Sequence, residues 1–218
     1  MKGKMKRILP VLLALCLLTA SALCETDTRF VTFGSYYTAP GSETKQPIEW
    51  IVLEEDETGM LLISRDILDC VVFHDRLENT SWEKCTLRRW LNGTFADAAF
   101  SEEEKALLLP CAVSPDPNPR APGVNQGAEV TDQVFLLSYA QAVSLIADTP
   151  AAQAVFTPWA ARYGTSPADE CGFWWLRTLA FDGTTVTGIS PEGYAASIAG
   201  LVTSTEVGVR PCIKVRIG

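Results

Sequence analysis

The chain has 218 residues, of which 47% are hydrophobic, and a formal net charge of −8 at neutral pH. This length suits one domain with a full hydrophobic core. The acidic balance argues against nucleic acid or an anionic membrane surface as partner, and a single histidine leaves little material for a zinc site. We expect neither a metal nor a cofactor.

The N-terminus has the order of a secretory signal peptide over residues 1–24. Four basic residues lie within the first seven positions, and an apolar stretch and then small residues follow them. We expect cleavage after Ala22 or, as the second choice, after Cys24, a short linker over residues 25–29 and one domain over residues 30–218. The loss of four basic residues would change the formal net charge from −8 to −12. The apolar stretch is short for a membrane span, so we expect a secreted or cell-surface product with no membrane attachment after cleavage.

The mature chain begins with strand patterns and continues with helices. Residues 30–33, 48–53 and 60–64 have the composition of strands, and the last two are expected to form a hairpin around an acidic turn. Capping boxes at Thr80, Ser101 and Ser138 predict helices that end at Asn92, before Pro110 and at Ala147. Residues 151–163 are also expected to be helical, with an interruption at Pro158.

A long loop and a group of strands complete the chain. Residues 114–132 contain four prolines and two glycines and are expected to form an exposed loop, which at this length is often functional. Residues 173–178, 184–189, 194–199 and 207–216 have strand patterns separated by turn residues. Strands, then helices, then a meander of strands predict a single α+β domain.

Seven short motifs, in order, resemble one family. They are Phe33-Gly34-Ser35-Tyr36, Pro47 to Leu53, Leu68-Asp69-Cys70, Trp82 to Arg88, Trp90-Leu91-Asn92 with Ala99-Phe100-Ser101, Trp174-Trp175-Leu176-Arg177 and Val207-Gly208-Val209-Arg210-Pro211. Together they resemble the DUF6273 family of secreted bacterial domains, which has no assigned function, over about residues 30–217. Thr178 and Tyr37 depart from the residues usual in that family.

A looser resemblance concerns the closing meander with its Gly-Val-Arg strand. It is similar to C-type-lectin-like bacterial domains, including the formylglycine-generating enzymes and the major paralogous domains of fibre-degrading bacteria. This resemblance implies a C-type-lectin-like fold. The oxidative activity of the formylglycine-generating enzymes is not implied, because their pair of catalytic cysteines cannot be placed on this sequence.

The strand 173–178 contains the first candidate site residues. Alternation places Trp175 and Arg177 on one face and Trp174 on the other. A functional interpretation makes Trp174 and Arg177 part of an aromatic platform for a sugar or peptide. The structural interpretation, a buried arginine stacked on tryptophan and paired with a carboxylate, is favoured because both faces are apolar. Arg210 is interpreted in the same way.

The long loop supplies two weaker candidates, Asp116 and Asn118. Asp116-Pro117-Asn118 resembles the tripeptide with which calcium-dependent C-type lectins bind calcium and sugar, but it offers few of the six to eight oxygen ligands that calcium takes. His74 has no serine or cysteine partner at a recognisable spacing and is expected at the surface. No catalytic motif is present, so we assign no catalytic residue.

Cys16 leaves with the signal peptide, as does Cys24 if cleavage follows it, and five further cysteines remain. Export makes disulfides the first expectation. We expect a bridge between Cys70 and Cys85, and with less support one between Cys171 and Cys212.

These observations favour an exported, non-catalytic binding or surface-interaction module whose unknown ligand is a glycan or a peptide. The alternatives are a carboxylate-based hydrolase of unknown substrate and a structural module without a ligand. Convergent acids with shifted pKa values would indicate the enzyme, and an exposed aromatic surface would indicate binding.

Overall fold

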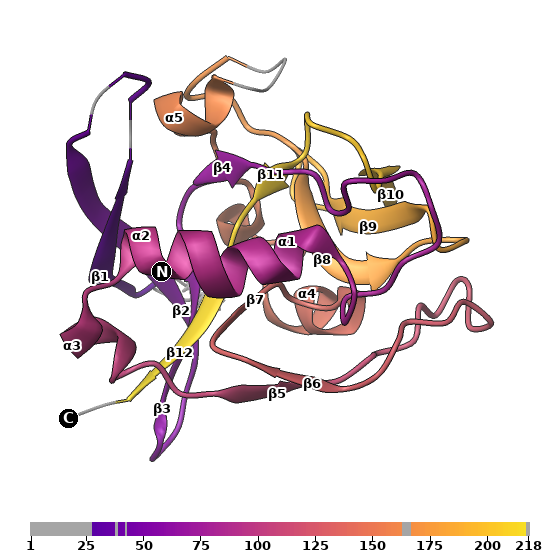
Figure 1. The fold of residues 1–218 in the computed structure, drawn as a ribbon, viewed down its shortest axis with the longest axis horizontal. Coiled ribbons are helices and arrows are strands. Elements are labelled where there is room, and N and C mark those ends of the chain that lie inside the picture. The colour runs from indigo at the N-terminus through magenta and orange to yellow at the C-terminus, as the bar shows by residue number, and fades with distance from the viewer. Residues whose placement is uncertain (1–27, 38, 42, 163–166, 217–218) are drawn as a thin grey trace, which may run out of the picture.

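The computed structural model describes residues 28–37, 39–41, 43–162 and 167–216. The predicted signal peptide, residues 1–24, lies outside the described residues. The chain forms two five-stranded sheets, a two-stranded ribbon and several short helices (Figure 1). The predicted single α+β domain is therefore confirmed.

The first sheet contains the N-terminal strands and the C-terminal strand. Its strands, in spatial order, are β1 (Phe30–Tyr37), β2 (Lys45–Glu55), β3 (Gly59–Ser64), β12 (Cys212–Arg216) and β7 (Val134–Phe135). β2 and β3 form the expected antiparallel hairpin. Trp50 of β2 is fully buried, and its indole Nε1 donates to the Phe33 carbonyl oxygen at 2.7 Å, which ties β1 to β2 from within the core.

The second sheet contains three of the four strands of the expected meander, and β11 pairs parallel to β8 instead of continuing it. Its strands, in spatial order, are β10 (Ala195–Leu201), β9 (Thr185–Ile189), β8 (Trp174–Leu179), β11 (Gly208–Val209) and β4 (Asp69–Cys70). Every residue of β8 is buried. The apolar residues on both faces of this strand are therefore explained by cover on both sides.

The chain passes from one sheet to the other at Arg210-Pro211. The predicted strand over residues 207–216 is broken there, because β11 belongs to the second sheet and β12 to the first. Proline cannot donate to a strand ladder, which suits it to such a break. Arg210 and Cys212, on either side of Pro211, are both fully buried.

The helices are short. They are α1 (Thr86–Trp90), the π-helical turn η1 (Leu91–Phe95), α2 (Ala96–Ala99), α3 (Glu102–Lys105), α4 (Tyr139–Leu145), the 3₁₀ turn η2 (Pro150–Ala152) and α5 (Pro158–Ala161). α1, η1 and α2 follow one another without a break, and Leu87, Leu91 and Phe95 form their fully buried face. This spacing of four residues places one side of the segment against the core.

Two of the three predicted capping boxes are confirmed, and one is wrong. Ser101 and Ser138 each accept a hydrogen bond from the third helical residue, whose side chain accepts one from the backbone of the cap. Thr80 caps no helix. The thiol of Cys85 caps α1 instead, and the residues before it form a turn in which the Lys84 and Cys85 N–H groups donate to the Ser81 carbonyl oxygen.

Other expectations about residues 74–163 also need correction. The helix from residue 80 does not end at Asn92, because η1 carries it through Gly93. Within the described part of residues 151–163, only η2 and α5 are helical. His74 is not a surface residue: it is 7% exposed, and its Nε2 lies 3.3 Å from a carboxylate oxygen of Glu78.

The long loop over residues 114–132 is fixed to the second sheet. The amide nitrogen of Asn118 donates to the carbonyl oxygens of Leu179 and Ala180, and Gln126 exchanges two hydrogen bonds with the backbone of Leu179. Both amide side chains are buried. The loop ends in β6 (Val130–Asp132), which pairs with β5 (Cys111–Val113).

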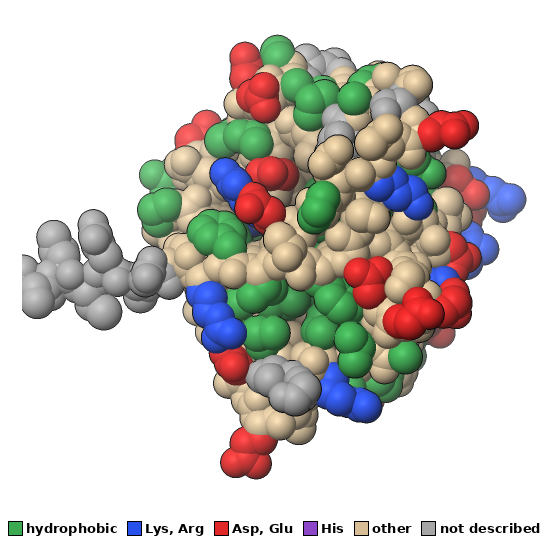
Figure 2. All heavy atoms as spheres, turned by 90° about the vertical axis from the view of Figure 1, so that its left-hand side faces the viewer, with side chains coloured by type: hydrophobic (Ala, Val, Ile, Leu, Met, Phe, Trp, Pro, Cys, Tyr) green, Lys and Arg blue, Asp and Glu red, His purple; other side chains and the backbone are tan. Residues whose placement is uncertain are grey.

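The surface is mixed in character on the side that Figure 2 shows. Acidic and basic side chains are interspersed there, and apolar side chains gather in the lower half of that face. No helix among the described residues is both long enough and apolar enough to cross a membrane.

Candidate functional site

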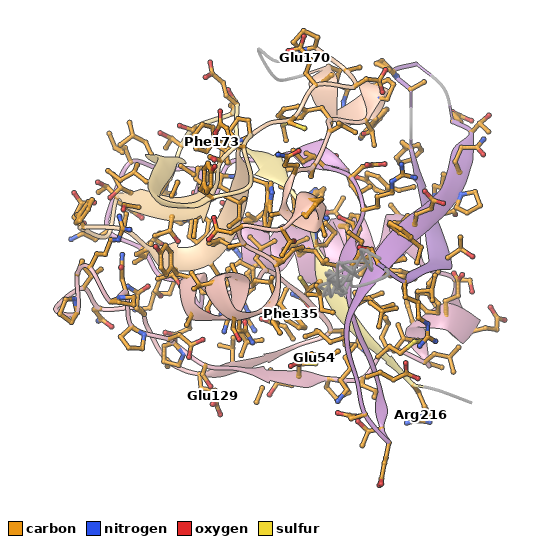
Figure 3. All side chains as sticks on the ribbon, turned by 180° about the vertical axis from the view of Figure 1, so that it is seen from behind. Glu54, Glu129, Phe135, Glu170, Phe173 and Arg216 are labelled. Carbon is orange, nitrogen blue, oxygen red and sulfur yellow. The ribbon has the colours of Figure 1, made fainter. Side chains whose placement is uncertain are left out.

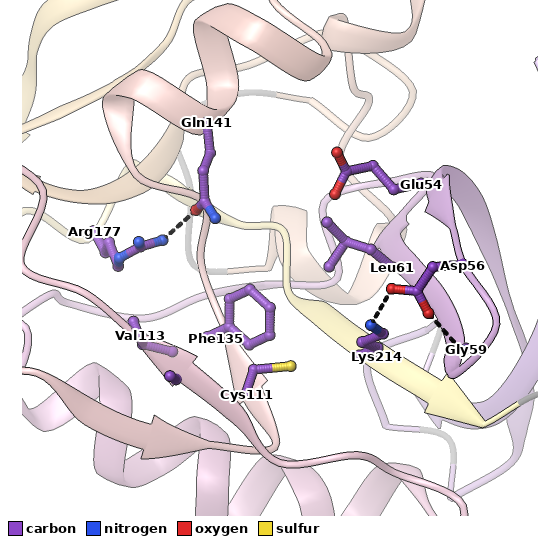
Figure 4. A pocket seen from close by; sticks show the side chains of 11 residues that line it. Glu54, Asp56, Gly59, Leu61, Cys111, Val113, Phe135, Gln141, Arg177 and Lys214 are labelled. Carbon is purple, nitrogen blue, oxygen red and sulfur yellow. Dashed lines mark hydrogen bonds and ion pairs between the residues drawn. The ribbon is translucent and has the colours of Figure 1, made fainter.

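A cavity of about 150 Å³ lies where β5, the start of α4 and the β2–β3 end of the first sheet meet (Figure 4). We call it the Arg177 cavity. Its lining includes Glu54, Cys111, Phe135, Gln141, Arg177 and Lys214. From behind, Phe135 and Glu54 lie close together beside the β5–β6 ribbon (Figure 3).

Arg177 of β8 reaches the inner end of the cavity. It is 5% exposed. Its Nη1 donates to the Leu136 carbonyl oxygen at 2.8 Å and to Gln141 Oε1 at 2.5 Å, and its Nη2 donates to a carboxylate oxygen of Asp116 at 3.0 Å and to the Ser114 carbonyl oxygen at 3.3 Å. Burial lowers the pKa of the guanidinium, and the Asp116 charge opposes that shift. The side chain therefore joins β8 to α4 and to the long loop.

The expected tryptophan contact is made by the other arginine. Arg210 lies with its guanidinium carbon 5.0 Å from the centre of the Trp174 ring. Trp175 donates from Nε1 to the Val71 carbonyl oxygen and packs edge-on against Phe73. Arg210 has no acidic partner within 4.0 Å among the described residues and donates to backbone carbonyl oxygens, Ser64 at 2.6 Å and Ala151 at 2.9 Å.

Gln141 is placed by its own helix. Its Oε1 accepts from the Ser138 backbone N–H in the capping box of α4 and from Arg177 Nη1. Both bonds use the oxygen, so the amide nitrogen Nε2 points away from Arg177 toward the open part of the cavity (Figure 4). Nε2 has no hydrogen-bond partner among the described residues. Two N–H donors are therefore available to a ligand.

One wall of the cavity is apolar and borders a free strand edge. Phe135 of β7 and Leu61 of β3 supply the apolar surface. All three residues of β5 line the cavity, and among the described residues β5 pairs with β6 alone. The thiol of Cys111 lies at this edge, and burial raises its pKa. It is therefore a thiol rather than a thiolate at neutral pH.

The outer rim of the cavity carries charge. Lys214 Nζ lies 2.7 Å from a carboxylate oxygen of Asp56. Hydrogen bonds from Lys214 and from Thr58 hold the pKa of Asp56 well below its usual range. Glu54 is exposed on the same rim and points toward the cavity (Figure 4).

The four residues proposed from sequence as binding candidates do not form one surface. Trp174 is fully buried and donates from Nε1 to the Ala152 carbonyl oxygen. Asn118 is 1% exposed and holds the end of β8. Asp116 pairs with Arg177, so both polar groups of the Asp-Pro-Asn tripeptide are engaged by protein. Only Arg177 lines the cavity. Among the described residues, no group of three or more potential metal ligands is present.

The predicted disulfides are not formed. Cys70, Cys85, Cys171 and Cys212 are free thiols in the structure, as is Cys111. The Cys85 thiol instead donates to the Trp82 carbonyl oxygen and caps α1. Sequence spacing alone had placed it near Cys70.

The other cavity residues were not singled out from the sequence. Gln141 carried a signal as the fourth residue of a capping box, but that pattern predicts a helix start and not a site. Phe135, Cys111, Glu54 and Lys214 come from four different strands, and only the packing of the ribbon against the first sheet brings them together.

Comparison with known proteins gives one match. Residues 57–217 match the family model of the domain of unknown function DUF6273. Neither the curated proteins nor the solved structures contain a significant match. The similarity to C-type-lectin-like domains therefore rests on the sequence motifs alone.

Proposed function

We propose that this chain, which belongs to the DUF6273 family of domains of unknown function, is an exported, non-catalytic module that binds a peptide in the Arg177 cavity. The observation that carries the proposal is the combination of a free strand edge with a small cavity. Peptides are commonly bound by adding a strand to such an edge, with main-chain hydrogen bonds supplying affinity and a side-chain pocket supplying specificity. β5 offers the edge, and the Arg177 cavity lies directly beside it.

The cavity suits one small side chain that carries a hydrogen-bond acceptor. A cavity of about 150 Å³ can hold a group the size of benzene. The ring of Phe135 and the side chain of Leu61 would pack against its apolar part. The Nε2 donors of Gln141 would bind its carboxylate or amide oxygen, because they have no other partner among the described residues.

The lining favours binding over carboxylate-based hydrolysis. Such hydrolysis needs two acids whose pKa values differ, one of them raised. Of the two carboxylates on the rim, Asp56 is held as an anion by Lys214, so its pKa is lowered. With Asp56 held by Lys214, no second carboxyl group in the cavity can act as an acid beside Glu54. Glu54 is better suited to attract a basic group of the ligand.

Gln141→Glu tests this proposal without disturbing the fold. Glutamate keeps the oxygen that accepts from Ser138 and Arg177, but it replaces the Nε2 donors by a second acceptor. Random heptapeptides displayed on phage would be selected on the purified full chain, and enriched peptides measured by fluorescence polarisation. We expect the variant to bind them at least about tenfold more weakly.

Gln46→Glu is the matched control, because Gln46 is an exposed residue of β2 outside the cavity. It makes the same change in charge and should leave peptide binding unchanged. If no peptide is enriched, or if the enriched peptides bind Gln141→Glu as well as the parent, the module does not bind peptide in this cavity.

A further inference from the structure

A second hollow lies apart from the Arg177 cavity. Three loop segments form it, residues 79–84, 123–128 and 182–183, and it measures about 620 Å³. We call it the polar groove. The three segments are far apart in the sequence and meet at the right-hand end of the molecule in Figure 1. None of its lining residues lines the Arg177 cavity.

The groove is held in shape by hydrogen bonds between its segments. The Thr80 N–H donates to the Gly183 carbonyl oxygen at 3.0 Å, which joins the first segment to the third. The Ala128 N–H donates to a carboxylate oxygen of Glu83 at 3.1 Å, which joins the first segment to the second. A ligand would therefore meet a preformed surface and would not have to order the loops on binding.

Close approach of the first two segments depends on Gly127. Its φ is +92°, in the region that favours glycine. A Cβ at this position would lie 2.7 Å from the side chain of Ser81. The groove is thus built on a backbone contact that a side chain at residue 127 would block.

The polar groups that remain free include both donors and acceptors. Asn125 Oδ1 accepts a hydrogen bond from the Gly127 N–H, so the amide nitrogen of Asn125 remains free to donate. Asp182 Oδ1 accepts from the N–H and hydroxyl groups of Thr184 and Thr185, so Oδ2 remains free to accept. Glu83 Oε2 accepts from the Ala128 N–H, so Oε1 remains free to accept. Val124 is the one apolar side chain larger than alanine in the lining.

This arrangement matches a ligand made of hydroxyl groups. A hydroxyl both donates and accepts, so it can pair with a carboxylate oxygen on one side and an amide nitrogen on the other. The two carboxylates against the single Lys84 would repel a phosphate, sulfate or carboxylate. The lining is more polar than apolar, which disfavours a hydrophobic ligand. We propose that the polar groove binds a neutral carbohydrate, independently of the peptide proposed for the Arg177 cavity.

The test is a glycan array that contains neutral, sialylated and sulfated oligosaccharides, probed with the purified full chain. The proposal expects binding to neutral glycans, followed by titration of the best of them by calorimetry. Asn125→Asp keeps the oxygen that accepts from Gly127 but removes the free donor. It should weaken neutral-glycan binding about tenfold or more.

Gln141→Glu is the control here, because Gln141 lies outside the polar groove. It should bind the neutral glycan as the parent does, even though it loses the peptide. The two proposals can therefore fail separately. Absence of glycan binding, binding confined to sialylated or sulfated glycans, or equal binding by Asn125→Asp and the parent would each overturn the carbohydrate site.

Discussion

Replacing Arg177 by alanine should destabilise the protein strongly. The substitution removes four hydrogen bonds at once and leaves the Leu136 and Ser114 carbonyl oxygens and the Asp116 carboxylate without their donor. Breaking a buried ion pair by removing one partner typically costs about 3–5 kcal/mol. The Asp116 side chain is 31% exposed and can be partly rehydrated, so we expect the lower end, about 3 kcal/mol.

That cost can be measured by calorimetry and urea unfolding. For a domain of this size it corresponds to a fall in Tm of about 6–12 °C. Arg177→Lys should recover less than half of the loss, because one ammonium group cannot span the Leu136 and Asp116 sides together as the planar guanidinium does.

Arg65→Ala is the control, because Arg65 forms an ion pair with Glu49 in which both side chains are about half exposed, at 53% and 48%. An exposed pair contributes about 0–1 kcal/mol. If Arg177→Ala melts as close to the parent as Arg65→Ala does, or if Arg177→Lys restores full stability, Arg177 does not hold the structure together as argued.

Three further predictions follow from single features. Intact mass of protein recovered from the medium should place the N-terminus at Leu23 or Glu25, whereas full-length chain found only in membranes would contradict export. In the folded protein, iodoacetamide should modify the half-buried Cys111 and Cys171 and spare the three buried cysteines. The rate at Cys111 should still rise above pH 9, because burial raises the pKa of its thiol. Peptide mapping that finds disulfide bridges would refute the free thiols. Asn118→Ala should lower stability by about 2–3 kcal/mol, because two carbonyl oxygens lose their donor, and should make the long loop sensitive to limited proteolysis; an unchanged digestion pattern would show that Asn118 does not anchor it.

The elements that could be predicted from sequence are those determined by nearby residues. The capping boxes at Ser101 and Ser138 each need only four consecutive residues, and both formed. The box at Thr80 has the same local pattern, but the chain there forms a turn whose Trp82 side chain donates to Asp132, 50 positions away. Local propensity was overridden there by tertiary packing.

The candidate site could not be predicted in the same way. Gln141 has a local role in its capping box, and nothing in that pattern shows that Arg177 would share its oxygen and turn its nitrogen outward. The free edge of β5 depends on where the ribbon ends relative to β12. Such features arise from long-range packing, which the alternation of residues in a single strand does not encode.

The two arginine motifs singled out in the sequence have structural explanations of different kinds. Arg177 is held by one carboxylate and by backbone at the meeting point of β8, α4 and the long loop. Arg210 is fully buried with carbonyl oxygens as its partners, and burial lowers its pKa to about 10, which still leaves it charged at neutral pH. Its donors tie Ser64, at the end of β3 in the first sheet, to Ala151 of η2.

These roles separate the residues that define the fold from those available to a ligand. Both arginines use most of their donors for groups of the protein, and the remaining ones, Arg177 Nε and Arg210 Nη2, are buried where a partner outside cannot reach them. The free donors and acceptors lie instead on Gln141, Asn125, Glu83 and Asp182, which are outside the family-identifying motifs or at their edge. In this chain the two arginines therefore fix the arrangement of the sheets, whereas the groups that can reach a ligand lie around the Arg177 cavity and the polar groove, so a ligand site and the fold rest on different residues.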